Sequence, residues 1–426
     1  MAAALCGGTI CFNLHATPTF ALAPPPSDAA QAGLRRAFKA SAEGILPAAD
    51  DLFTKAISDW KEQPPDELAA LFKERGKVRF QQNRLAQSLA DLTKSLELMQ
   101  VSGSTPDPSE IQRAYVLRAR VNAASQAWRA AESDLSAAIT RLDELDAIEA
   151  TNPYLYAERS AARSRLGDYA GASDDALRAE TDFKLIGEKV RRILAAADAA
   201  LALYGNGEVE PAIEKMRYVF KNKGVPASNN PDDIGLLQEL SRKDAELHLA
   251  YAGHLFDAEQ KRPEAERQWE SGCVRLEAYV QDGLERQREE EALLQKERQL
   301  AEAQGKSETL RASSVALNPF NSDTVARLNG LDPQSPYVTQ RPQRSYFWYK
   351  VGEGEIERRD AGIAFADVDA TLSCAKFRSN DWLRENRPDW PEPLVARVGK
   401  YAANVPQGAI VMPPKGSPPT RGELDF

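Results

Sequence analysis

Residues Pro153–Glu180, PYLYAERSAARSRLGDYAGASDDALRAE, carry the pattern from which the fold can be predicted. It predicts two short helices joined by a turn at Gly167–Tyr169. Small residues stand at Ser160, Ala172 and Ala179, where the two helices must touch. Two antiparallel helices can pack at the short end of the usual 8–10 Å range only if the residues at their crossing are small. The stretch therefore indicates a closely packed helical hairpin.

The same pattern occurs in five copies along the chain. Each copy has a small residue eight positions into its first helix, a second one twelve residues later, a filler four residues on, and a third position three beyond that, which is small in every copy except at Val219. The small positions are Gly76, Ser88 and Ser95; Ala119, Ala131 and Ala138; Ser160, Ala172 and Ala179; Ala200, Ala212 and Val219; and Gly253, Ala265 and Gly272. No single pair buries its apolar face alone, so the copies must stack.

This arrangement of small and large residues resembles the tetratricopeptide repeat (TPR) family over about Leu68–Arg275. The resemblance implies an all-α fold, a TPR-like helical-hairpin solenoid of about five repeats. Successive copies are spaced more widely than the ~34 residues of the family, because surplus residues fall between them at Val101–Ser109 and Asn222–Asp233. We therefore expect loops or extended second helices to interrupt a regular superhelix.

Composition divides the rest of the chain. We expect a targeting segment or disordered leader over 1–27, N-terminal helices over 28–66, the repeat array over 67–280, a charged extended helix over 281–305, a linker over 306–345, a small C-terminal helical capping segment over 346–405, and a disordered tail over 406–426. The charged helix is either solvated and held by charge pairs or a partner-facing coiled coil. A hairpin over Tyr346–Glu357 is a further expectation.

The leader is unlike the rest of the chain, since residues 1–27 contain no Asp, Glu, Lys or Arg. Ala21–Ala23 forms a small-x-small cleavage pattern, typical of a targeting segment. Thr19–Pro24 resembles the Ala-Phe-Ala-Pro junction of signals that enter complex algal plastids. The resemblance implies a plastid location, stromal or thylakoid-associated. A cytoplasmic location is the expectation if the leader is not a signal.

The C-terminal region resembles the ending of a group of plastid repeat proteins of plants and algae. The residues that carry this resemblance are Cys374–Phe377, Asp381–Leu383, Arg387, Trp390, Pro391 and Leu394. Asp389 and Glu392 stand where that group has an Arg and a second Pro. The resemblance supports a plastid location and implies a scaffolding role. Independently of it, the residues predict a terminal helix that caps the last repeat.

Charge and motifs exclude several classes of protein. The chain has 54 Lys and Arg against 63 Asp and Glu, a net charge of -9, which argues against a general nucleic-acid binder. No apolar run approaches the ~20 residues of a membrane helix, although the protein could be peripheral to a membrane complex. There is no phosphate-binding loop, no nucleophile elbow and no HExxH motif. We therefore expect no enzymatic activity and no cofactor.

Cysteine and histidine spacing predicts no metal site. The four cysteines are Cys6, Cys11, Cys273 and Cys374. They form no CxxC pair, so we expect buried free thiols, with contact between the two distal cysteines as the alternative. His248 and His254 are six residues apart, whereas a helical metal pair needs a spacing of about four.

The candidate site is the concave face. In the TPR family this face is lined by positions 2, 5, 9, 12 and 13 of each first helix. The resemblance therefore implies a partner-binding groove formed by Lys73, Lys77, Phe80, Arg113, Arg120, Tyr154, Arg165, Tyr204 and His254. Its N-terminal half is basic with aromatics and its other half is apolar, which suits a protein or peptide segment with an acidic end and a hydrophobic body. Alternatively, these cations pair with local carboxylates and His254 is a surface residue.

One TPR sub-class can be tested directly. Co-chaperones of the family hold a terminal carboxylate with a clamp of Lys, Asn and Arg residues spread over three repeats. Lys73 and Lys77 match the first part of that clamp, but Leu117 and Tyr154 do not match the rest and Glu158 has the wrong sign. A chaperone-tail receptor is therefore not expected.

The predicted function is a non-catalytic TPR scaffold that binds another protein or peptide in its groove. Given the plastid resemblance, we expect an assembly or maintenance factor for a thylakoid protein complex. Two alternatives remain. One is an enzyme or cofactor-carrying protein that uses the C-terminal insert, and the other is a structural subunit of a membrane-associated complex.

Overall fold

The computed structural model describes residues 26–42, 44–101, 107–141, 152–222, 231–303 and 372–406. The secondary structure of these residues is helical, and no strand occurs among them. The helices are α1 (Asp28–Ala42), α2 (Leu46–Asp59), α3 (Pro65–Gln81), α4 (Leu85–Met99), α5 (Pro108–Ala124), α6 (Trp128–Thr140), α8 (Pro153–Leu166), α9 (Tyr169–Leu185), α10 (Lys189–Gly205), α11 (Val209–Asn222), α12 (Pro231–Asp257), α13 (Arg262–Ala303), the short 3-10 helix η2 (Lys376–Arg378), α19 (Asn380–Asn386) and α20 (Glu392–Asn404). Most of the predicted leader, the linker, the Tyr346–Glu357 hairpin and nearly all of the tail lie outside the described residues.

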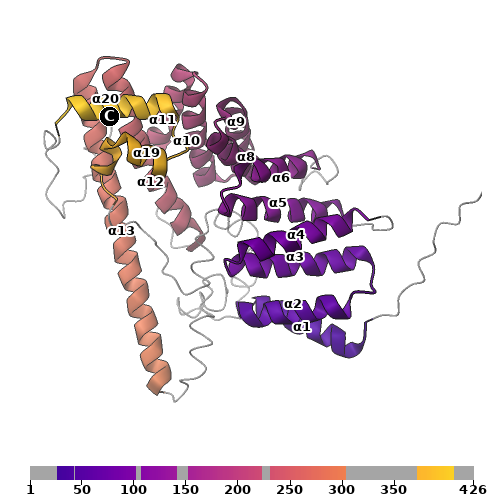
Figure 1. Ribbon diagram of the computed structural model, residues 1–426. Coiled ribbons are helices and arrows are strands. Elements are labelled where there is room, and N and C mark those ends of the chain that lie inside the picture. The colour runs from indigo at the N-terminus through magenta and orange to yellow at the C-terminus, as the bar shows by residue number, and fades with distance from the viewer. Residues whose placement is uncertain are drawn as a thin grey trace, which may run out of the picture.

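Helices α1 to α13 form successive hairpins. Sequence neighbours pack as α1 with α2, α3 with α4, α5 with α6, α8 with α9, α10 with α11 and α12 with α13. Each hairpin stacks on the next, as α2 on α3, α4 on α5, α6 on α8 and α9 on α10. Figure 1 shows the hairpins arranged side by side from the N-terminal pair to the long α13. The predicted all-α, TPR-like solenoid is therefore confirmed.

The small residues lie at the helix crossings. All fifteen small positions of the five copies are buried, which is what close packing between α3 and α4, and between each later pair, requires. A Cβ atom added at Gly76 would lie 2.9 Å from Cγ of Leu92, and one added at Gly272 would lie 2.7 Å from Cδ2 of Leu249. Even a methyl group does not fit there without movement, because real Cβ contacts are longer than 3.0 Å.

A positive φ angle marks the turn inside every repeat. It occurs at Asn83, Gln126, Gly167, Gly207 and Gln260, between the first and second helix of successive copies. Glycine and asparagine adopt this left-handed conformation readily, whereas glutamine does so at a cost. The same turn geometry recurs where the residue type does not favour it. Helix packing, rather than local preference alone, therefore imposes the hairpin.

An arginine–aspartate pair links the two helices in each of the first three repeats. The guanidinium of Arg159 on α8 donates two hydrogen bonds, of 2.8 and 2.7 Å, to the carboxylate of Asp175 on α9. The equivalent pairs are Arg75 with Asp91 and Arg118 with Asp134. In each repeat a second side chain, one turn later on the first helix, also donates a hydrogen bond to this aspartate. These side chains are Arg79, Asn122 and Arg163, in chain order. An aromatic ring three residues before each arginine, at Phe72, Tyr115 and Tyr156, lies beneath its guanidinium. Bidentate pairs of this kind are strong and orientation-specific.

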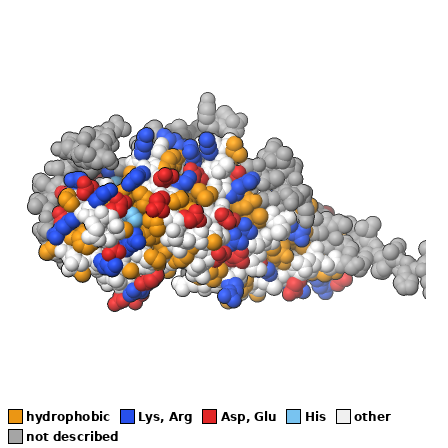
Figure 2. Space-filling model, turned by 90° about the horizontal axis from the view of Figure 1, so that it is seen from above, with side chains coloured by type: hydrophobic (Ala, Val, Ile, Leu, Met, Phe, Trp, Pro, Cys, Tyr) orange, Lys and Arg blue, Asp and Glu red, His pale blue; other side chains and the backbone are white. Residues whose placement is uncertain are grey.

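Charges of both signs also cover the outside of the molecule. Figure 2 shows Lys and Arg side chains interspersed with Asp and Glu side chains on the face seen from above, with hydrophobic side chains between them. Several of these groups form pairs within one helix, such as Arg262 with Glu266 and Lys55 with Asp59. Exposed pairs of this kind contribute little to stability, so the buried pairs inside the repeats matter more.

The C-terminal segment folds back on the last two repeats. Helix α20 packs against α12 and α10, and its Leu394, Val398 and Tyr401 are buried in the largest hydrophobic cluster, together with Phe377 and Trp390. A Cβ atom added at Gly253 on α12 would lie 2.9 Å from the Cα of Val398. The backbone of α20 therefore comes as close to α12 as paired helices do within a repeat.

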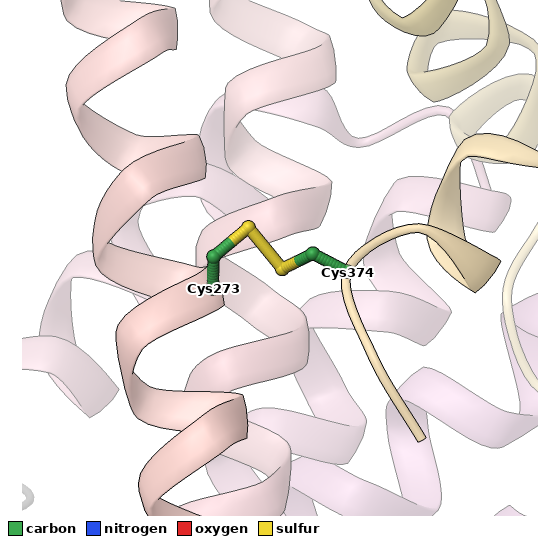
Figure 3. Close-up of a disulfide and its surroundings, with 2 residues drawn as sticks. All are labelled: Cys273 and Cys374. Atoms are coloured by element: carbon green, nitrogen blue, oxygen red, sulfur yellow. A yellow bond between two sulfur atoms is a disulfide. The ribbon is translucent and has the colours of Figure 1, made fainter. Parts of the chain in front are cut away.

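The prediction of free distal thiols was wrong. Cys273 on α13 and Cys374 at the start of the C-terminal segment form a disulfide, with their Cα atoms 5.4 Å apart (Figure 3). The two cysteines are 101 residues apart in sequence, so spacing gave no sign that they pair. They meet because the C-terminal segment packs on α12 and α13, through contacts such as Trp269 with Tyr401.

Helix α13 belongs to the array only in its first part. Its N-terminal residues Ala265, Trp269 and Cys273 are buried against α12. The helix then continues without a break to Ala303, a total of 42 residues, and its far end extends away from the packed helices in Figure 1.

The arginine–aspartate pair yields a stability test. We expect Asp175→Asn to lower the free energy of unfolding by about 3 kcal/mol, because it removes the buried anion shared by Arg159 and Arg163. Asp174→Asn is the matched control, since Asp174 is exposed on the same helix and should change stability by less than about 0.5 kcal/mol. Urea unfolding measures both values. Equal effects of the two substitutions would contradict a structural role for this pair.

The disulfide yields a second test. In unreduced protein, we expect Cys374→Ser to lower the free energy of unfolding by about 2–4 kcal/mol, because a large covalent loop is opened. Ser373→Ala, at the exposed neighbouring position, serves as the control and should be nearly neutral. Maleimide labelling followed by mass spectrometry should leave Cys273 and Cys374 unmodified in the unreduced wild type. Labelling of both thiols would show that the bond does not form.

Candidate functional site

The inner wall of the array contains a cavity of about 580 Å³. Its walls are formed by the first helices α5, α8, α10 and α12, with contributions from α6, α9 and α13 and from the loop that follows α19. Three of the nine predicted groove residues line it: Arg120, Tyr154 and Arg165. The structure thus brings together the middle of the predicted groove and places the other six residues elsewhere.

The cations near the N-terminal end are paired with local carboxylates. The ammonium group of Lys73 on α3 and the guanidinium of Arg113 on α5 both bond to the carboxylate of Glu110. Burial would raise the pKa of Glu110, but the two cations, chiefly Lys73, lower it below its ordinary value. Lys77 is half-buried on α3. The alternative that these cations have local partners therefore holds for Lys73 and Arg113.

Phe80 is part of the core. It is 1% exposed and packs in a cluster with Leu92, Leu117 and Val121 between the first two repeats. Its side chain therefore stabilises the stacking of α3, α4 and α5.

Arg120 lines the cavity, but its guanidinium is already bound to a carboxylate through two hydrogen bonds. Its side chain is 2% exposed, and its Nε and Nη2 donate hydrogen bonds of 3.0 and 2.6 Å to the carboxylate of Glu158 on α8. Burial lowers the pKa of Arg120 and the neighbouring Glu158 opposes this effect. Because breaking a buried pair of this kind is costly, we assign Arg120 a role in joining α5 to α8.

Arg165 is different from these cations. It lies at the end of α8 with its guanidinium over the ring of Trp128, 5.4 Å from the ring centroid. Among the residues that the structure describes, no acceptor lies within hydrogen-bond distance of it, and its nearest carboxylate is that of Asp389 at 3.9 Å. The side chain is 32% exposed. Arg165 is therefore a cation in the cavity wall with donors available for a ligand.

Aromatic and small side chains form the apolar part of the cavity. Tyr154 contacts Phe183 edge to face, with ring centroids 5.2 Å apart, and the guanidinium of Arg191 lies over the Tyr154 ring. Leu194 and Leu201 of α10 complete this wall. The small residues at the helix crossings, such as Ala131 and Ser160, line its floor, so the repeat pattern itself creates the hollow.

A set of charged groups from α10 and α12 lines the far side. Lys243 is paired with Asp198 and lies 3.9 Å from the carboxylate of Asp389. Burial alone would lower the pKa of Lys243, but these two carboxylates raise it above its ordinary value. Arg242 bonds to Glu239 and to Glu246. The cation at Lys243 is therefore charged at any physiological pH.

Tyr204 and His254 are covered by the C-terminal helix. Arg397 of α20 donates hydrogen bonds to the Tyr204 hydroxyl (2.6 Å) and to Nδ1 of His254 (2.7 Å), and both residues are buried. Burial raises the pKa of Tyr204 to about 12, and burial together with Arg397 lowers that of His254. The alternative of a surface histidine was wrong, because α20 covers His254.

Sequence reasoning missed the other polar residues of the cavity. They are Arg191, Asp198, Glu239, Arg242, Lys243, Asn386, Arg387 and Asp389. Lys243 and its neighbours lie on α12. This helix begins at Pro231, earlier than the repeat pattern around Gly253 predicts for the first helix of the fifth copy. The unusual spacing before that copy was a usable signal for an extended first helix. The residues from the C-terminal segment gave no signal of this kind.

Two further properties concern metals and membranes. Within the described ranges, no group of three or more His, Cys, Asp or Glu residues is placed to hold a metal ion. None of the described helices combines the length and the hydropathy needed to cross a bilayer.

Comparisons with known proteins give distant similarities. No protein-family model matches the chain, and no curated protein matches its sequence. Among solved structures, it is similar to BtubC (BKLC) from P. vanneervenii, with a TM-score of 0.39 and 11% identity over 59% of this chain and 92% of that one. It is also similar to a Rap protein complexed with competence and sporulation factor, with a TM-score of 0.33 and 13% identity over 70% of this chain and 75% of that one. Similarity at this level carries no conclusion about function, and the fold stands on the helix packing described above.

Proposed function

We propose that this protein is a non-catalytic helical-repeat scaffold that binds an acidic segment of another protein in the cavity between α5, α8, α10 and α12. The observation that carries the proposal is the environment of Arg165. Its guanidinium is held over Trp128 in the cavity wall, and its nearest carboxylate is beyond hydrogen-bond distance. A planar guanidinium binds a carboxylate through two parallel hydrogen bonds, so an acidic side chain is the group it would receive.

The size and lining of the cavity support a peptide ligand. A volume of about 580 Å³ lies within the range of about 300–1,000 Å³ found for ligand sites. Tyr154, Phe183 and Leu194 belong to the lining of the same cavity as Arg165. An extended or helical segment with an acidic residue beside an apolar one would satisfy both parts of the wall.

The carboxylates of the cavity support binding rather than acid–base chemistry. Glu158 is held by Arg120, and Asp198 is held by Lys243. Each of these carboxylates is thus bonded to a cation of the same chain rather than directed at a ligand, although burial raises the pKa of Asp198 above its ordinary value. We therefore favour a scaffold over the enzyme alternative.

We further propose that the protein acts in a plastid, as an assembly or maintenance factor peripheral to a thylakoid complex. The uncharged leader, with its Ala21–Ala23 pattern, and the C-terminal resemblance to plastid repeat proteins support this proposal. The Cys273–Cys374 disulfide favours an oxidising environment, because disulfides are rare in the cytosol.

Peptide binding tests the proposed site. The probe is a fluorescein-labelled octapeptide of alternating Glu and Tyr, followed by fluorescence anisotropy. We expect Arg165→Glu to weaken binding at least about tenfold, since one charge-assisted hydrogen bond contributes about 1.5–3 kcal/mol. Arg129→Glu, an exposed change on α6, carries the same change in net charge and should leave affinity unchanged. A peptide of alternating Lys and Tyr should not bind. Equal loss in both variants would refute the site.

A fusion experiment tests the location. Residues 1–27 joined to a fluorescent protein should accumulate in the plastid of an alga that has complex plastids, because the leader alone is expected to carry the address. Replacing Phe20 with Ala in the same fusion should reduce import, since Phe20 is the aromatic residue of the junction. Fluorescence of the unaltered fusion that stays in the cytosol would rule out the plastid address.

A further inference from the structure

The loop after α19 forms one side of the cavity and is held firmly. Arg387 donates a hydrogen bond from its Nε (2.8 Å) to the buried carboxylate of Glu246, and its guanidinium lies over the rings of Phe377 and Trp382. The backbone N–H of Trp390 donates a 2.9 Å hydrogen bond to the carbonyl of Arg387, closing a turn. Trp390 itself is buried. The position of Asp389, between these two anchors, is therefore fixed by the fold.

Asp389 places its carboxylate between two cations of the cavity. Oδ1 lies 3.9 Å from Nη2 of Arg165 on α8, and Oδ2 lies 3.9 Å from Nζ of Lys243 on α12. Burial would raise the pKa of Asp389, but Lys243 and Arg165 lower it below its ordinary value, so the group is an anion. Both distances exceed those of direct charge-assisted hydrogen bonds, which are about 2.7–2.9 Å. The carboxylate thus neutralises the two cations without saturating their donors.

We propose that Asp389 is an internal competitor that occupies the anion position of the cavity and sets its affinity for acidic partners. This inference rests on the proposed function, because it concerns the same site. A carboxylate on the same chain acts at a high effective concentration. An incoming acidic side chain must therefore displace it, or accept its repulsion, before binding Arg165 closely.

The competitor makes the cavity selective. A ligand with one isolated carboxylate gains little, since it exchanges one anion beside Arg165 for another. A ligand that adds apolar contacts with Tyr154 and Phe183, or a second acidic residue, gains more than Asp389 can offer. We therefore assign the site to segments in which acidic and aromatic or apolar residues alternate, and we expect simple carboxylates such as acetate to be rejected.

The test uses the full-length protein and the same labelled peptide of alternating Glu and Tyr. We expect Asp389→Asn, which keeps the side-chain shape and removes the charge, to bind the peptide about tenfold more tightly than the wild type. Glu392→Gln is the matched control: it makes the same change in net charge three residues away, where Glu392 is exposed and paired with Arg384. It should leave the affinity unchanged. Asp389→Asn in an Arg165→Glu background should give no gain.

The outcomes separate the two proposals. If the wild type binds and Asp389→Asn binds equally or more weakly while its melting temperature is unchanged, the competitor is refuted and the proposed function stands. If Glu392→Gln binds as tightly as Asp389→Asn, bulk charge explains the gain and the competitor is refuted. If neither the wild type nor Asp389→Asn binds the peptide, both proposals fall. Asp389→Ala, tested in parallel, should bind the peptide as tightly as Asp389→Asn. If Asp389→Ala binds more weakly than the wild type while Asp389→Asn binds more tightly, a purely electrostatic competitor is refuted.

Discussion

The structure depends on how closely two helices can approach each other. In every repeat the crossing residues are small and buried, and at Gly76 and Gly272 the neighbouring leucine leaves no room even for a methyl group. Close approach aligns the first helices side by side. It also lines the cavity floor with residues such as Ala131 and Ser160. The feature that holds each hairpin together therefore also produces the hollow on the inner wall.

Charge pairing decides which part of the inner wall is available to a partner. In the first three repeats, buried aspartates such as Asp175 fix the two helices of a hairpin through bidentate arginines. Among the predicted groove cations, Lys73 and Arg113 pair with Glu110, and Arg120 pairs with Glu158. Arg165 remains, supported by Trp128 and without an acceptor at bonding distance among the described residues. A protein with many cations thus offers a small and defined basic site.

The C-terminal segment is part of the site as well as part of the core. Helix α20 buries Tyr204 and His254, which shortens the groove to its middle portion. The disulfide between Cys273 and Cys374 holds the start of the same segment on α13. The loop between α19 and α20 then brings Asp389 to the cavity. One segment therefore closes the apolar half of the inner wall and supplies an anion to the rest.

The helical hairpins could be predicted from the amino-acid sequence, because small residues at fixed spacing are a local requirement of close helix packing that recurs in every copy. The resemblance to the TPR family added Arg120, Tyr154 and Arg165 as groove residues, and these three line the cavity. The packed fold was needed to show that Arg120 pairs with Glu158, that Cys273 meets Cys374, and that Arg397 of α20 covers His254. These three contacts join residues 38, 101 and 143 positions apart. No repeating pattern along the chain encodes such distant pairs, so only the packed fold reveals them.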